Sequence, residues 1–109
     1  MTTITIFQDK NQNYVGFDCT GHAGFAKFGK DVVCAGISIL VINTINSIET
    51  FTSVPFVCEA DEETGDIDFR FTEEISQDAI LLIDSMILGL NEIQNDYGKK
   101  FLILDFKEV

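Results

Sequence analysis

Two long helical patterns interrupt a series of short alternating patterns in this sequence, and this succession limits the folds open to the chain. In the alternating stretches apolar residues recur at every second position, as in a β-strand with one buried face. In the helical stretches they recur every three or four positions. The predicted strands are residues 2–8, 14–19, 56–60, 66–71 and 101–106, and the predicted helices are 31–50 and 72–97.

The order ββαββαβ predicts an α+β fold in which two helices pack on a mixed β-sheet in two layers. Polar residues between the strands of each pair predict two hairpins, the second with an acidic tip. Residues 37–42 are apolar almost all round, so we expect the first helix to be largely buried. Thr72 is the expected N-cap of the second helix and Gly98 its terminator. The length of 109 residues favours a single domain, residues 1–109.

Composition excludes several classes of function. A net charge of −11 disfavours direct binding of nucleic acid through its phosphates, but such a charge attracts basic partners. The N-terminus shows no signal peptide and the chain no transmembrane helix, so we expect no membrane association. Three cysteines without a Cys-x-x-Cys pair favour a reducing cytoplasm, and one histidine predicts no metal site.

Residues 59–78 contain nine of the 18 acidic residues and a single basic one, Arg70. One interpretation is a solvated hairpin tip. The other is a surface that attracts a basic substrate by long-range electrostatics.

The chemistry-bearing stretch combines a cysteine near the start of a helix with the only histidine of the chain. If Asp31 is the N-cap, Cys34 is the third helical residue, where the helix dipole and free N–H groups stabilise a thiolate nucleophile. His22 precedes it on a glycine-bearing loop and can act as general base. Asp31 either orients His22 or only caps the helix. Ser38, one turn after Cys34, either lies near the thiol or bonds a helix carbonyl.

Three other features of the sequence carry weaker signals. The stretch 24–31 nearly matches a phosphate-binding loop, but Asp31 stands where a magnesium-binding Ser or Thr is needed and would repel phosphates, so nucleotide binding is disfavoured. Cys19 and Cys58 fall in predicted strands, and we expect both to be buried and unreactive. Phe25 and Phe28 form a contact surface or lid, or else enter the core.

The blocks Gly21-His22-Ala23 and Asp31-Val32-Val33-Cys34-Ala35-Gly36-Ile37-Ser38, with a glycine-containing loop between them, resemble the signature of the ribosomal-processing cysteine protease family, Prp. The resemblance covers essentially the whole chain. It implies that Cys34 is the nucleophile and His22 the general base, and it matches Gly21, Asp31 and Ser38 to motif positions whose roles are less defined.

The resemblance further implies a cytoplasmic bacterial endopeptidase that is a homodimer and needs no cofactor. The implied substrate is the precursor of large-subunit ribosomal protein twenty-seven, whose N-terminal extension is cut after an aromatic pair. The loop 24–30 would close over the substrate, so we expect a long separation between Cys34 and His22 when substrate is absent. Alternatives are a non-catalytic ribosomal-protein-binding or ribosome assembly factor, and a structural dimer with a buried Cys34.

Overall fold

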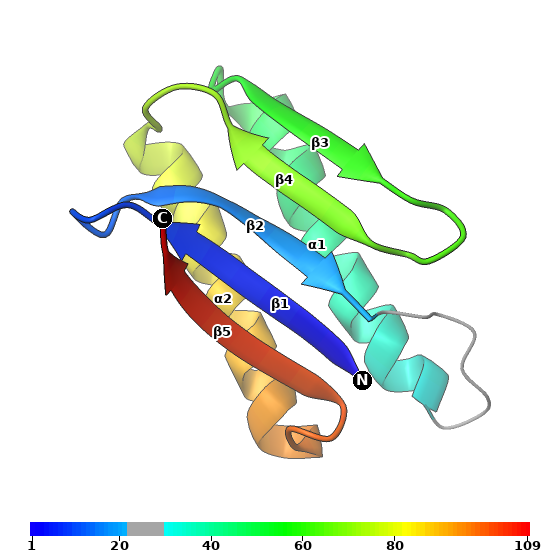
Figure 1. The fold of residues 1–109 in the computed structure, drawn as a ribbon. Helices are drawn as coiled ribbons and strands as arrows, with labels where there is room; N and C mark the ends of the chain where they lie inside the picture. Colours follow the sequence, from blue (N-terminus) through cyan, green and yellow to red (C-terminus); the bar gives the residue numbers. More distant parts are fainter. Residues whose placement is uncertain (22–29) are drawn as a thin grey trace.

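A five-stranded mixed sheet forms one layer of the fold, and two helices cover one of its faces (Figure 1). The computed structural model describes residues 1–21 and 30–109, with the backbone alone for 30 and 31. Its elements are β1 (Thr2–Gln8), β2 (Tyr14–Thr20), α1 (Lys30–Phe51), β3 (Phe56–Ala60), β4 (Ile67–Phe71), α2 (Gln77–Tyr97) and β5 (Leu102–Glu108). The α+β fold with the order ββαββαβ is therefore confirmed.

The strands lie in the order β3-β4-β2-β1-β5. Both predicted hairpins are confirmed as antiparallel pairs, β1 with β2 and β3 with β4. The first hairpin meets the second through β2 and β4, which are also antiparallel. The last strand returns beside β1 and runs parallel to it, so that Ile4 is aligned with Leu104. The first strand of the chain is thus an interior strand, and β3 and β5 form the two edges.

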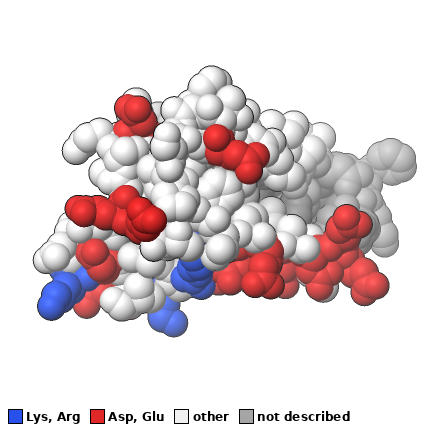
Figure 2. Space-filling view, turned by 90° about the horizontal axis from the view of Figure 1, so that it is seen from above, with Lys and Arg blue, Asp and Glu red and all other residues white. Residues whose placement is uncertain are grey.

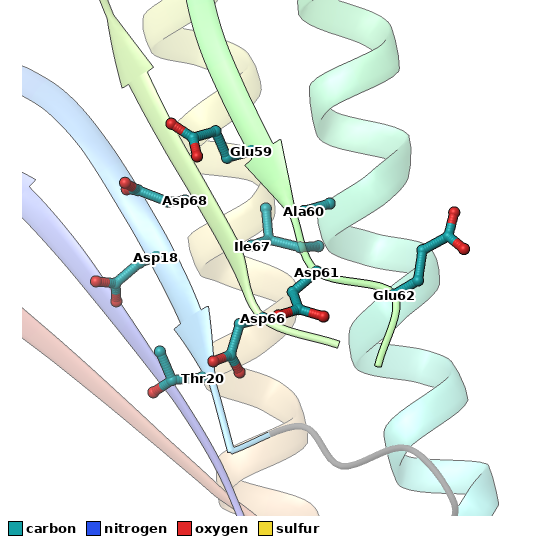
Figure 3. Close-up of a pocket in the computed structure, with 9 residues that line it drawn as sticks. All are labelled: Asp18, Thr20, Glu59, Ala60, Asp61, Glu62, Asp66, Ile67 and Asp68. Atoms are coloured by element: carbon teal, nitrogen blue, oxygen red, sulfur yellow. The ribbon is translucent and has the colours of Figure 1, made fainter. Parts of the chain in front are cut away.

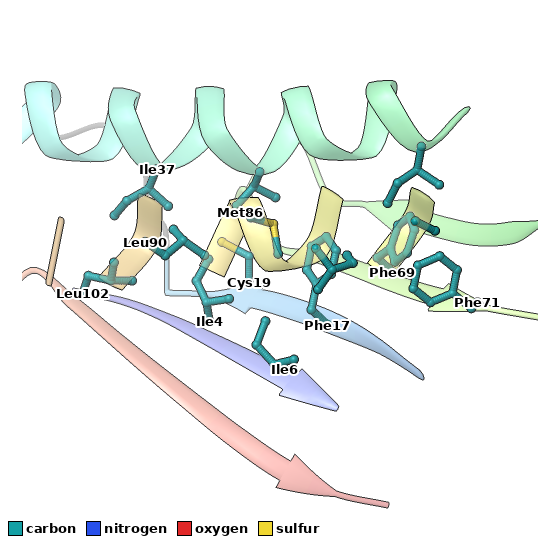
Figure 4. Packing of buried hydrophobic residues seen from close by; sticks show 14 of the residues in the cluster. Ile4, Ile6, Phe17, Cys19, Ile37, Phe69, Phe71, Met86, Leu90 and Leu102 are labelled. Atoms are coloured by element: carbon teal, nitrogen blue, oxygen red, sulfur yellow. The ribbon is translucent and has the colours of Figure 1, made fainter. Parts of the chain in front are cut away.

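One hydrophobic core joins the two layers (Figure 4). Ile4, Ile6 and Phe17 point from the sheet toward the helices and are fully buried. Phe17 stacks on Phe69 with ring centroids 4.8 Å apart, so the aromatic side chains tie the two hairpins together under the helices. Burial of such large apolar side chains supplies most of the driving force for folding.

The start of α2 differs from the prediction. Ser76, not Thr72, is the N-cap, and its Oγ accepts a hydrogen bond of 3.3 Å from the Ala79 N–H. The N–H of Thr72 instead donates to the carbonyl of Pro55, which extends the contact between the ends of the β3–β4 hairpin. Thr72 therefore directly follows β4, and its backbone pairs with the residue that precedes β3 instead of starting the helix. Gly98 ends α2 as predicted, with φ 94°.

The prediction that α1 is largely buried is only half right. Val33, Ile37, Val41 and Ile48 lie in the core, whereas Ile39 on the opposite face is 68% exposed. By length and composition alone α1 is apolar enough to cross a membrane. Because one of its faces is packed against the sheet and α2, it is the core helix of a globular domain.

Candidate active site

Cys34 is the fifth residue of α1, because the helix begins at Lys30. The expectation that Asp31 is the N-cap is wrong, since its backbone already belongs to the helix. The side chains in a sequence indicate where an N-cap residue is favourable, but the backbone hydrogen bonds decide where the helix begins. The four N–H groups without helical partners therefore precede Cys34. Helical side chains lean toward the N-terminus, so the Cys34 side chain still lies over this first turn.

The Cys34 side chain is half-buried. Burial raises the pKa of the Cys19 thiol to about 12, and the neighbouring groups Asp66, Asp18 and Cys34 add to the rise. This electrostatic effect requires the two thiols to be close, although one is on a helix and the other on a strand. Cys34 on α1 is therefore within electrostatic range of Cys19 on β2, the strand that leads to Gly21.

The other two cysteines are poor nucleophiles for different reasons. Cys19 is 2% exposed, as predicted, and its high pKa keeps the thiol protonated. The prediction that Cys58 is buried is wrong, because β3 is an edge strand and leaves this side chain exposed. Partial desolvation, with Asp68 nearby, raises the pKa of Cys58. Cys34 is the cysteine that combines partial exposure with a position near a helix start.

Gly21 has a structural reason to be glycine. Its φ is +73°, and a Cβ at this position would lie 2.6 Å from the carbonyl oxygen of Met1. The backbone at Gly21 therefore turns sharply as β2 ends. Ser38 lies on α1, one turn after Cys34, and is half-buried.

Several predicted features fall outside the part of the chain that the structure describes. They are His22, Phe25, Phe28 and the side chain of Asp31. The expected long distance between Cys34 and His22 involves one of these residues, so this expectation also falls outside the described part of the chain.

An acidic pocket of about 610 Å³ lies at the end of the sheet where β2 finishes (Figure 3). Six of its nine lining residues are acidic, and they come from β2, β3, β4 and the β3–β4 turn. They are Asp18, Glu59, Asp61, Glu62, Asp66 and Asp68, and the other three are Thr20, Ala60 and Ile67.

The carboxyl groups in this pocket lie close enough to influence one another. Burial raises the pKa of Asp18, and Asp68 and Asp66 add to the rise although Arg70 opposes it. The sequence predicted the acidic second hairpin but not the contribution of Asp18 on β2. The alternation of side chains along the strand could have identified it. Asp18 lies between Phe17 and Cys19, whose side chains face inward, and therefore points outward. Its register partner on β4 is Asp68.

Comparison with known proteins bears directly on this site. The family model for the cysteine protease Prp matches residues 1–101. The chain belongs to the Prp family of cysteine proteases. A Prp relative, the ribosomal processing cysteine protease Prp of Bacillus subtilis (strain 168), is 35% identical over 101 residues, covering 89% of this chain and 90% of its own.

Two solved Prp structures from S. aureus share the fold. One holds a covalently linked product peptide, has a TM-score of 0.88 and is 26% identical, covering 98% of this chain and all of its own. The other holds a substrate peptide, with a TM-score of 0.89, 25% identity and the same coverage. The resemblance inferred from the two sequence blocks is thereby confirmed. As a member of the Prp family, the chain is a hydrolase that acts on peptide bonds.

Proposed function

We propose that this Prp-family chain is an endopeptidase that removes the N-terminal extension from a precursor of large-subunit ribosomal protein twenty-seven. Relatives that span almost all of this chain are named ribosomal processing proteases, and this supports the class of substrate. The identity of the ribosomal protein rests on the family resemblance of the sequence blocks. The observation that carries the catalytic part is the position of Cys34, half-buried near the start of α1 and within electrostatic range of Cys19 on β2.

In the proposed mechanism the Cys34 sulfur attacks the carbonyl carbon of the scissile peptide bond. His22 takes the thiol proton and delivers it to the nitrogen of the leaving amine, and an acyl-enzyme thioester remains. Water then attacks the thioester, passing a proton back through His22, and the carboxylic acid product and free thiol are released. A covalently linked product in the S. aureus relative supports a covalent route of this kind. Ser38 and Asp31 would assist by positioning and Gly21 by its backbone turn.

The acidic pocket supplies the second half of the proposal, which is capture of a basic substrate. Proteins that bind ribosomal RNA carry Lys and Arg to neutralise phosphates, so a ribosomal protein precursor is basic. The carboxylates of Asp18, Asp61 and Asp66 lie at the end of the sheet where β2 leads toward His22 (Figure 3). They would attract the basic part of the substrate while the aromatic pair before the scissile bond occupies the site.

The whole chain, residues 1–109, would act as one protease domain, without a cofactor, in the cytoplasm and as a homodimer. Three free cysteines, one of them the exposed Cys58, fit a reducing compartment.

The test is incubation with a synthetic peptide that spans the end of the extension and the start of the mature ribosomal protein. We expect two products, separated by chromatography and identified by mass. Cys34→Ala should yield none, and Cys58→Ala, a matched control at the exposed cysteine, should cleave at the wild-type rate. Binding of the peptide by the wild-type protein without any cleavage would reject the proposal and favour a ribosome assembly factor.

A further inference from the structure

The two edges of the sheet differ in what covers them. At the edge formed by β5, two backbone N–H groups that point away from β1 are taken by α2 and the residue that ends it. Leu102 donates to the Gly98 carbonyl at 3.3 Å, and Leu104 donates to Gln94 Oε1 at 2.9 Å. The second half of β5 is mostly charged, which also discourages pairing with another strand. The edge at β5 is therefore closed.

β3 forms the other edge, and no strand among the described residues pairs with its outer side (Figure 1). The Thr72 N–H donates to the Pro55 carbonyl, and the Asp61 N–H donates to the Asp66 carbonyl. These two bonds fix which backbone groups of β3 face β4, because the groups of an antiparallel strand alternate between its two sides. Odd-numbered residues face β4, so the N–H and carbonyl groups of the even-numbered ones point outward. The outward-facing residues are Phe56, Cys58 and Ala60.

The side chains of β3 strengthen this contrast between the edges. Val57 is 55% exposed, and the small side chains of Cys58 and Ala60 are exposed as well. Glu59 is the single charged residue of the strand. An edge with so little charge, whose backbone groups point outward, is a template on which a further strand can pair.

We infer that the outer edge of β3 holds the substrate, and that the segment of the precursor after the scissile bond adds there as a sixth, extended strand. This inference rests on the protease function proposed above and adds how the substrate is held. Backbone hydrogen bonds would align the segment without regard to its sequence. Selectivity would come from the side chains on the two faces of the added strand.

Charge favours a basic segment on one of these faces. Glu59 is the register partner of Asp68, and Asp68 is that of Asp18, so three carboxylates form a row across the open face of the sheet. Figure 2 looks onto the molecule from the side where β3 lies and shows acidic residues gathered on the side of the sheet. A basic residue on the added strand would extend this row beside Glu59. The segment after the scissile bond belongs to the mature ribosomal protein, which binds RNA and is therefore basic.

The other face of the added strand would lie on the side of the helices. Cys58 is the register partner of the buried Phe69, and Ala60 is that of Ile67, so both side chains point to that side. Because they are small, they leave room for apolar side chains of the peptide. The favoured segment therefore alternates, with basic residues beside Glu59 and apolar residues toward the helices.

The edge lies within reach of the candidate nucleophile. Ala60 pairs in register with Ile67, and Ile67 with Cys19, so the three residues form one row across the sheet. Neighbouring strands lie about 4.8 Å apart, which places an added strand about 14 Å from Cys19 along this row. Cys34 is within electrostatic range of Cys19. About four or five extended residues span such a distance, so the added strand would begin that far beyond the scissile bond.

A second copy of this chain fits the same edge less well. Residues 59–78 contain nine acidic residues and one basic residue, and pairing two β3 strands would bring two such hairpins together. Their like charges repel, whereas a basic peptide is attracted.

Hydrogen exchange of single backbone amides, followed by NMR, tests the inference on Cys34→Ala, which should bind the precursor peptide without cleaving it. The peptide carries the aromatic pair before the scissile bond and about ten residues after it, enough to reach β3 and pair with it. At saturation, confirmed by calorimetry, exchange of the Cys58 and Ala60 amides should slow at least 10-fold. The Val57 and Glu59 amides are internal controls, because they face β4 and should exchange slowly with or without peptide.

Unchanged exchange at Cys58 and Ala60 in the saturated complex overturns the inference. Slow exchange of these two amides in the free protein also overturns it, because a second copy or another segment would then already cover the edge.

Peptides that each carry one backbone N-methyl group extend the test to cleavage by the wild-type chain. Alternate residues of an added strand bond β3, so N-methylation at every second position should raise KM at least 5-fold and leave kcat unchanged. The positions between them should have little effect. A uniform effect, or none, contradicts strand addition.

Ala60→Pro removes one outward N–H of β3, and proline is accepted on an edge strand where its nitrogen faces away from the sheet. It should raise KM at least 5-fold. Phe106→Pro makes the same change at the β5 edge and should keep the wild-type KM. Circular dichroism shows whether each variant is folded, and the N-methyl series decides the question without either. Strand addition uses the backbone of Cys58 and not its thiol, so Cys58→Ala keeps every group that the peptide would bond.

These experiments separate the inference from the protease proposal. A chain that cleaves the peptide without alternating effects overturns only the strand addition. A chain that binds it with protected Cys58 and Ala60 amides but never cleaves overturns only the cleavage. A peptide that does not bind at all overturns both.

Discussion

The thiol of Cys34 lies near enough to the thiol of Cys19 to help raise its pKa, although one belongs to the helix layer and the other to the sheet. The two should nevertheless react very differently with iodoacetamide. Cys19 is buried and stays protonated, and the raised pKa of Cys58 reduces its thiolate fraction despite its exposure. We expect Cys34 to be alkylated at least 10-fold faster than either at pH 7, as measured by mass spectrometry of proteolytic peptides. Faster labelling of Cys58 would contradict the assignment of the nucleophile.

Replacement of His22 tests the proposed general base. A positioned base contributes about 10²- to 10⁴-fold to such a reaction, so His22→Ala should lower kcat/KM for the precursor peptide by at least about 100-fold. Asn11→Ala, in the exposed turn of the first hairpin, serves as control and should cleave normally. Wild-type activity in His22→Ala would mean that another group takes the proton.

Neutralising the acidic pocket should weaken capture of a basic peptide without changing the chemical step. In the double variant Glu59→Gln with Asp61→Asn we expect KM to rise several-fold at low salt while kcat stays constant. The difference should vanish at about 0.5 M salt, where exposed charges are screened. The double variant Glu73→Gln with Asp78→Asn removes the same charge outside the acidic pocket and provides the control. Equal KM values for the two double variants would show that only net charge matters.

Asp18 should make stability depend on pH in a defined direction. Its pKa is raised in the folded protein, so the folded state holds a proton more strongly than the unfolded state. The contribution of Asp18 to stability is therefore full below its ordinary pKa of 3.8 and is lost as the pH rises through the folded value. We expect Asp18→Asn to raise Tm at pH 7, by at most about 3 °C, and to have no effect near pH 3. A lower Tm at pH 7 would contradict this sign.

Two glycine substitutions should change stability in opposite directions. A Cβ at Gly16 on β2 would lie 2.2 Å from the carbonyl oxygen of Phe69 on β4, so Gly16→Ala must push two paired strands apart. We expect a loss of about 2–3 kcal/mol in the free energy of unfolding, measured with urea. At Gly36 in α1 the nearest atom to a Cβ is Ile93 Cδ1, at 3.9 Å. Gly36→Ala should therefore stabilise by about 0.5–1 kcal/mol through helix propensity. A neutral Gly16→Ala would show that the strands separate easily.

Many structural features of this protein were predictable from the local pattern of its sequence. The period of two in residues 2–8 and 14–19 predicted the first hairpin, and the strand at 56–60 was predicted with the bounds that the structure has. The inward face of β2 also predicted that Cys19 is buried. Such features depend on the repeat of apolar residues within one element, which the sequence displays directly. The placement of Cys34 near the start of a long helix belongs to this group.

The features that the local pattern did not predict depend on contacts between distant parts of the chain. The pairing of β5 with β1, which makes β1 an interior strand, arises from backbone hydrogen bonds that no local pattern encodes. The exposure of Cys58 is likewise not encoded locally, because it depends on β3 being an edge strand. Nor is the use of Ser76 instead of Thr72 as the N-cap of α2. In α1 the spacing of Val33, Ile37, Val41 and Ile48 marked the face that is buried, but the apolar run from 37 to 42 led to the wrong expectation that the opposite face is covered as well. The sheet and α2 cover one face and leave Ile39 on the other, because an α-helix packed in a two-layer fold has only one side against the core.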